Sequence, residues 1–229
     1  MKKANLILFL IFICSNFAAA TDPNLVVWYE FDETSGQNIN DSSGNGYHTT
    51  ASEVPIWEIN GVIGGCLSND VAWKNQNIAV PTEAFQTIDQ QATFAFWAQL
   101  TDLGGAESTG GWFTGTNSSG QIVAKIIPYP GSAVNDLFLP YKMHIPFTAG
   151  GPDNDWWWGY GENTLPYEWH HLAMVFNAEQ GTEKLYFDGQ LMTSAQTEQG
   201  DSMANMEDFN IFARTSTPGA WWDSFHGKM

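Results

Sequence analysis

The stretch EWHHLAMVFNAEQGTEKLYFDGQLM, residues 168–192, decides the fold class. Residues 168–177 are apolar at both alternating sets of positions, which is typical of a central strand covered on both faces. Residues 183–192 carry Asp188-Gly189 between two strand-like runs, and this dipeptide favours a tight hairpin because both turn positions need positive φ. The stretch therefore predicts paired antiparallel strands.

Further strands are predicted on either side of this stretch. Residues 25–31, LVVWYEF, are β-branched and aromatic and are interpreted as the opening strand, and residues 208–214 as a late one. In residues 92–100, ATFAFWAQL, one face carries the predicted core positions Phe94, Phe96, Ala98 and Leu100, and the other carries Thr93, Ala95, Trp97 and Gln99.

The rest of the chain favours the same class. The 22 glycines and 10 prolines cut it into short runs, and residues 82–89 have apolar spacing for no more than a helical turn. We therefore predict an all-β fold, a two-sheet antiparallel β-sandwich or jelly roll, in which residues 21–229 form a single domain.

The N-terminus predicts export. Lys2 and Lys3 precede an apolar run and a small-residue site ending at Ala20, so residues 1–20 are interpreted as a signal peptide cleaved after Ala20. No later apolar run is long enough to span a bilayer, and we expect no membrane insertion. The expected location is secreted, periplasmic or at the cell surface.

Net charge limits the kinds of molecule that the protein can bind, and the cysteine count limits its disulfides. Cleavage after Ala20 removes two lysines and no acid, which moves the formal charge from −17 to −19. Such an acidic chain repels nucleic acid and anionic lipid and favours neutral or cationic partners. The one remaining cysteine, Cys66, is either a small buried position or half of a bridge to another chain or segment.

Five stretches resemble a known family when read in order: WYEFDETSGQNINDSSGNGYHTT, WEINGVIGGCLSND, ATFAFWAQL, EWHHLAMVFN and LYFDGQ. Together they resemble bacterial exported laminin G-like domains of the concanavalin A-like lectin/glucanase superfamily. The resemblance implies a jelly roll that binds carbohydrate or protein, in some members with calcium at the sheet rim. It also implies a further strand beyond Met229, so we expect the domain to lack its last strand.

The stretch DNDWWWGYG, residues 153–161, supplies the candidate ligand site. In an extended chain Trp156 and Trp158 share one face and Trp157 the other, so at least one ring faces away from the core. An exposed ring is a platform for the apolar face of a sugar, with neighbouring polar groups for its hydroxyls. The alternatives are a ridge on the Trp158 face, or burial of all three rings. The predicted ligand-binding residues are Trp157, Trp158, Asp155, Asn154 and, from a distant loop, Trp222.

The stretch DSSGNGYH, residues 41–48, allows two interpretations. Its oxygen-rich side chains predict a calcium site made by Asp41 and Asn45, with Asp32 as an additional ligand. The alternative is that Asp41 caps the amides of its own loop and binds no metal.

Catalytic patterns are incomplete in this chain. Laminarinase-type glycosidases use E-x-D-x-x-E, whereas here Glu30 and Asp32 are followed by Ser35 in place of the second Glu. His170 and His171 must point to opposite faces of a strand, so they cannot chelate one ion together. The resemblance to laminin G-like domains implies that His171 is the core residue of the two. We therefore favour a non-catalytic carbohydrate-binding module over a surface adhesion or protein-interaction domain, and both over a polysaccharide-degrading enzyme.

Overall fold

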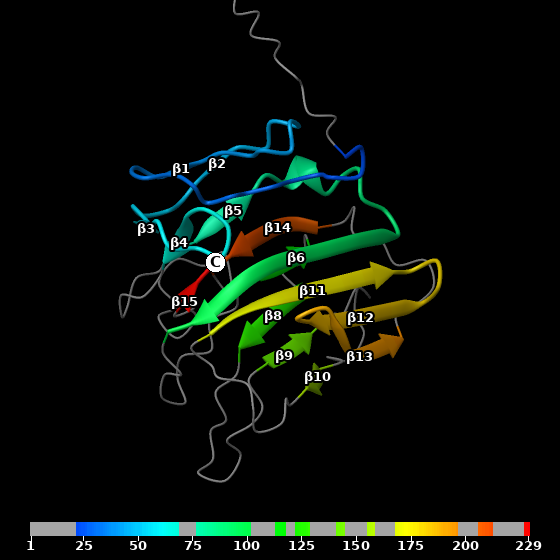
Figure 1. Cartoon of the computed structure of the whole chain (residues 1–229). Helices are drawn as coiled ribbons and strands as arrows, with labels where there is room; N and C mark the ends of the chain where they lie inside the picture. The colour runs from blue at the N-terminus through cyan, green and yellow to red at the C-terminus, as the bar shows by residue number, and fades with distance from the viewer. Residues whose placement is uncertain are drawn as a thin grey trace, which may run out of the picture.

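The computed structural model describes residues 22–68, 77–101, 113–117, 122–128, 141–144, 155–158, 168–196, 206–212 and 227–229 (Figure 1). Regular structure within these ranges is β, apart from the short 3₁₀ helix η1 (Thr82–Ala84). Both the all-β class and the limit of one turn in residues 82–89 are confirmed.

The strands form two large antiparallel sheets and one small one. The seven-stranded sheet has the order β13 (Gln190–Gln196), β12 (Thr182–Phe187), β11 (Trp169–Asn177), β6 (Gln91–Leu100), β15 (Gly227–Lys228), β4 (Cys66–Ser68) and β3 (Ile56–Glu58). The six-stranded sheet has the order β10 (Asp155–Trp158), β9 (Tyr141–His144), β8 (Ile122–Pro128), β7 (Phe113–Asn117), β14 (Met206–Ile211) and β5 (Ile78–Val80). The small sheet pairs β1 (Asn38–Ile39) with β2 (Thr49–Thr50).

Strand β11 is an interior strand of the larger sheet, as its apolar composition predicts. It pairs with β6 from Trp169 to Asn177 on one side and with β12 on the other (Figure 1). Alternation along β11 is regular, because its even-numbered residues are buried and its odd-numbered ones are half-buried. Core side chains come from both sheets, including Leu172, Phe176, Leu185, Ile78 and Phe209.

The predicted hairpin is also confirmed. Asp188 and Gly189 connect β12 to β13 with φ values of 47° and 77°, the paired positive angles of a tight two-residue turn. On β6, Phe94 and Phe96 pack against the core and Ala98 is buried, while Thr93, Ala95 and Trp97 are exposed, so the predicted core face is correct.

The predicted opening strand at residues 25–31 is wrong. These residues, hereafter the N-terminal segment, form only an isolated bridge between Tyr29 and Asp41. Side chains rather than a neighbouring strand bind the backbone: the Asp41 carboxylate accepts from the Trp28 N–H, and the Asn45 side-chain amide donates to the carbonyls of Leu25 and Val26. The same segment also lines a cavity.

Candidate binding site

A cavity of about 470 Å³ lies between the N-terminal segment and β6, and we call it the edge groove. Side chains from both faces of β6 line it, with Phe94 and Phe96 from the core face and Thr93 and Trp97 from the opposite one. Because successive strand side chains alternate between faces, a cavity that touches both sets must run along the edge of the strand.

The edge groove begins where β15 ends. Strand β11 covers one side of β6 from Gln91 to Gln99, whereas β15 pairs with β6 only through Gly227 with Leu100 and Lys228 with Gln99. Met229 follows directly and lines the groove. Within the described residues, therefore, β6 has a strand on both sides only at Gln99 and Leu100. From Gln91 to Ala98 it pairs with β11 alone.

The floor of the edge groove is part of the hydrophobic core. Val80, Ala84 and Phe85 line it and are buried in the core cluster. The ring of Phe209 lies 4.9 Å from that of Phe85 and 5.3 Å from that of Phe94, between centroids. This packing makes the floor apolar and aromatic.

The mouth of the edge groove gathers exposed apolar side chains. Trp28, Val62, Ile63 and Trp97 line it, and they are four of the seven large hydrophobic side chains that are exposed in the described residues. Soluble proteins seldom concentrate exposed apolar surface in one place unless it contacts something. The distribution therefore makes this region a candidate interaction surface.

Beside the groove, the sheet face turned away from the core carries an aromatic platform. Trp97 lies opposite His171 across β6 and β11, with ring centroids 5.2 Å apart in an edge-on arrangement. In the adjacent row, Ala95 pairs with Ala173, whose other neighbour is Tyr186. The two alanines leave space next to the exposed Trp97 ring, and we call these five residues the sheet platform.

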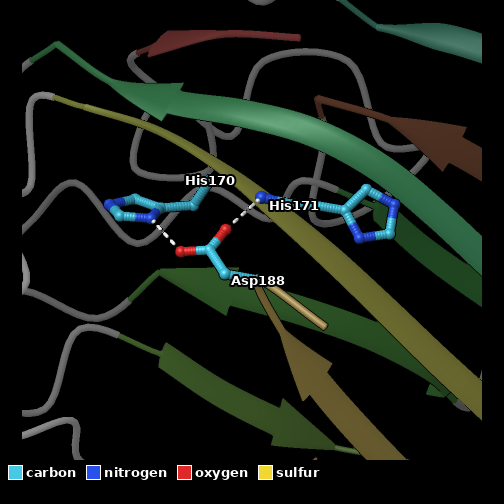
Figure 2. A network of polar contacts seen from close by, with 3 residues as sticks. All are labelled: His170, His171 and Asp188. Carbon is cyan, nitrogen blue, oxygen red and sulfur yellow. Dashed lines mark hydrogen bonds and ion pairs between the residues drawn. The ribbon is translucent and has the colours of Figure 1, made fainter. Parts of the chain in front are cut away.

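One carboxylate anchors the strand that carries His171 (Figure 2). The Asp188 carboxylate lies 2.8 Å from His170 Nδ1 and accepts a 2.9 Å hydrogen bond from the His171 backbone N–H. The Asp188 N–H in turn donates to the His171 carbonyl at 2.8 Å. The hairpin turn therefore holds the first residues of β11 and, with them, the platform.

The two histidines point in opposite directions, as predicted (Figure 2). The expectation that His171 is the core residue is wrong, because His170 is the buried one and its ring packs against Phe187 at 4.5 Å. The phase of the strand decides this: Leu172 is fully buried, so the residue two positions earlier faces the core with it.

Asp41 has the capping arrangement in this structure. Its Oδ1 accepts from the N–H groups of Trp28 and Ser43, and its Oδ2 accepts from the Ser43 hydroxyl and the Tyr47 N–H. Burial opposes its charge, but these hydrogen bonds outweigh burial and hold the pKa of Asp41 below its ordinary value. A carboxylate has about four lone-pair positions, and all are used here, so Asp41 does not fit a calcium ligand.

The other two predicted calcium ligands are also engaged with the protein. Asp32 accepts a hydrogen bond from the Gly65 N–H, and the Asn45 amide is bound to backbone carbonyls. The described residues contain no group of three or more His, Cys, Asp or Glu side chains placed to hold a metal. Cys66 is a free, buried thiol.

The predicted ligand site is described only in part. Asp155 to Trp158 form β10, an edge strand of the six-stranded sheet that lies against β13, so the extended conformation is confirmed. The side chains of Asp155, Trp157 and Trp158, and all of Asn154 and Trp222, lie outside the described residues. Which ring faces outward stays a prediction.

Trp97 and Trp28 are not among the site residues predicted from the sequence. The signal for Trp97 was present, because alternation already placed a large aromatic side chain on the face of β6 away from the core. Trp28 was hidden by the interpretation of residues 25–31 as a paired strand.

Comparison with known families and structures agrees with this fold. Residues 73–229 match a family model described as the concanavalin A-like lectin/glucanases superfamily. Domain 4 of AbnA, an extracellular arabinanase from Geobacillus stearothermophilus solved in complex with arabinotriose, is 14% identical, with a TM-score of 0.51 over 86% of this chain and 90% of that one.

Two toxin structures are similar as well. The binding domain of Paraclostridial Mosquitocidal Protein 1 is 14% identical, with a TM-score of 0.57 over 87% of this chain and 49% of that one. Botulinum neurotoxin type C, which interacts with two ganglioside molecules, gives 13% identity and a TM-score of 0.54 over 86% and 45%. The chain thus spans about half the length of these two, and at such identities the likeness establishes the fold alone.

No curated protein sequence matches the chain. Among the described residues, no helix has the length and apolar character needed to cross a membrane.

Proposed function

Because the chain belongs to the concanavalin A-like lectin/glucanase superfamily, we propose that it is a non-catalytic module that binds a neutral polysaccharide by stacking sugar rings on aromatic side chains. Structures with the same fold include an arabinanase domain solved with arabinotriose and a toxin that interacts with gangliosides, which supports a binding role in general.

The observation that carries the proposal is the sheet platform. Trp97 is 38% exposed on the face of β6 turned away from the core, and the small side chains of the paired Ala95 and Ala173 lie beside it. A pyranose or furanose ring packs its C–H face on such an indole, while its hydroxyls need polar neighbours. Thr93 and Lys184, which flank Val175 in the next row, provide them.

Glu30 and Asp32 are the two carboxylates that match part of the glycosidase pattern. Both make structural hydrogen bonds, which supports a non-catalytic role. Glu30 accepts a hydrogen bond from the Ser42 hydroxyl, and Asp32 accepts one from the Gly65 N–H. Both carboxylates are thus used to hold loops together.

Titration of the intrinsic tryptophan fluorescence with arabinotriose and a panel of neutral oligosaccharides tests the proposal. We expect saturable binding with a Kd of about 0.1–1 mM, since one stacking site binds weakly. Trp97→Ala should weaken binding at least tenfold, and Leu191→Ser, an exposed apolar control on the last strand of the same sheet, should not. Equal binding by Trp97→Ala and the parent would contradict the platform.

Strand β10 provides a second proposed platform. Its residues Asp155, Trp157 and Trp158, with Asn154 and Trp222, are the ligand residues that the sequence predicts. Trp97 lies on β6. Three strand spacings, about 14 Å, separate β6 from β13, and β13 is the strand that contacts β10. The two platforms are therefore separable, and loss of sugar binding in Trp157→Ala but not in Trp97→Ala would assign the site to β10.

The proposal also includes export of the protein and calcium binding, both of which rest on the sequence alone. N-terminal sequencing of the secreted protein should begin at Thr21 if the signal peptide is cleaved after Ala20. Calcium binding would have to use ligands other than Asp41, because that carboxylate is saturated with hydrogen bonds. A thermal melt in excess chelator that equals the melt in calcium would remove the metal from the proposal.

A further inference from the structure

We propose that the sheet platform binds a stretch of at least three sugar units, held by two aromatic side chains rather than by Trp97 alone. The second is Tyr186 on β12. The inference rests on the proposed function and extends it from a single stacked ring to a chain of defined minimum length. Trp97 and Tyr186 would hold the first and third units, and the middle unit would lie over β11.

Tyr186 is on the same side of the sheet as Trp97. Its neighbours along β12, Leu185 and Phe187, are both buried in the core, so the side chain between them points to the outward face. Tyr186 is half-buried there, which leaves part of its side chain accessible. Two aromatic residues, on strands separated only by β11, therefore share this face.

The pairing register sets the distance between the two residues. Trp97 lies opposite His171 and Tyr186 lies opposite Ala173, so the two pairs are two residues apart along β11. Two strand spacings and two residues of strand place the Cα atoms of Trp97 and Tyr186 about 12 Å apart. A sugar unit advances its chain by about 5–6 Å, given ordinary bond lengths. A trisaccharide is therefore the shortest ligand that reaches both rings.

The side chains between the two rings are small. The line from Trp97 to Tyr186 crosses β11 between His171 and Ala173. Ala173 carries only a methyl group, and its partner Ala95 on β6 is exposed. The middle sugar unit would pack on these methyl groups beside the His171 ring, which contacts Trp97 edge-on. A larger side chain at Ala173 would lift the chain from one or both rings.

The charge of this face also suits an extended neutral chain. The outward positions are the odd-numbered residues of β6 and β11 and the even-numbered residues of β12, and none of them is Asp or Glu. The whole chain has 25 acidic residues. Covering a carboxylate with a neutral ligand is costly because its charge loses water, and a sugar chain that crosses these three strands avoids that cost.

The experiment measures how affinity depends on ligand length. The probes are arabinose oligomers and β-1,4-linked glucose oligomers of one to five units, titrated against tryptophan fluorescence. Affinity should rise about tenfold between two units and three, because only three units reach both rings. From three units to five it should change less than about twofold, since no further ring is contacted.

Variants then assign the second ring. Tyr186→Ala should weaken trisaccharide binding about tenfold and leave disaccharide binding unchanged, whereas Tyr186→Phe, which keeps the ring, should bind both as the parent does. Trp97→Ala should weaken binding of every oligomer. Ala173→Leu is an independent test, because it obstructs the path between the rings and should also weaken trisaccharide binding about tenfold while the melting temperature is retained.

The outcomes separate this inference from the proposed function. Equal affinities for two and three units, or equal trisaccharide affinities in Tyr186→Ala and the parent, would overturn the inference. If Trp97→Ala still weakens binding of every oligomer in that case, the proposed function stands with a single stacking site. If no oligomer binds, or if Trp97→Ala binds all of them as the parent does, the proposed function is contradicted as well.

Discussion

Replacing Asp41 by alanine should destabilise the protein more than its position in a loop suggests. The substitution removes the acceptor of four hydrogen bonds, three from backbone N–H groups and one from the Ser43 hydroxyl. A hydrogen bond to a charged group contributes about 1.5–3 kcal/mol. Water will reach some of the released donors, so we expect a net loss of about 3 kcal/mol rather than the full sum.

The assay is a thermal melt of the parent and Asp41→Ala, with Asp22→Ala as the control. A loss of about 3 kcal/mol in a domain of this size lowers the melting temperature by about 6–12 °C. Asp22 accepts one exposed hydrogen bond, from the Asn24 N–H, and its removal should cost less than about 0.5 kcal/mol. If Asp41→Ala melts with the parent, or if it abolishes a calcium-dependent shift, the capping argument is refuted.

Three further predictions concern pH, the hairpin and the thiol. Because the pKa of Asp41 is lowered in the folded state, the stabilisation that its charge gives the fold is present above the unfolded pKa of about 4 and is lost as pH falls through the folded pKa. Below pH 4, the melting temperature of the parent should therefore fall more steeply with pH than that of Asp41→Asn. Gly189→Ala should cost about 1 kcal/mol, measured by urea unfolding, because the glycine has a φ of 77° with open space around a new Cβ. Burial and the neighbouring Glu58 raise the pKa of Cys66, so at pH 8 a thiol reagent should react at least tenfold faster after unfolding in urea than with the folded protein; equal rates would contradict its burial.

Regular alternation and turn chemistry made much of the fold predictable. Residues 168–192 carry both signals, and the structure has the central strand and the hairpin where they indicate. These features are local, since each depends on side-chain order within a few residues.

The features that the sequence predicts wrongly depend on contacts between residues distant in the sequence, or on the exact phase of a strand. Residues 25–31 have strand composition, but a strand also needs partners, and here the loop around Asp41 supplies side-chain acceptors and donors instead. The core histidine was misassigned by one position, and a one-residue change of phase exchanges the two faces of a strand. The exposure of Trp97 follows from alternation, but the groove beside it is lined by segments far apart in the sequence, among them Val62, Phe209 and Met229, which local patterning does not encode.

Saturation-transfer NMR with arabinotriose tests the central claim, that sugar stacks on Trp97, most directly. Irradiation of the protein should transfer magnetisation to the sugar C–H protons that face the indole, and Trp97→Ala should abolish this transfer while the melting temperature is retained. Transfer of equal strength in the parent and in Trp97→Ala would contradict the account.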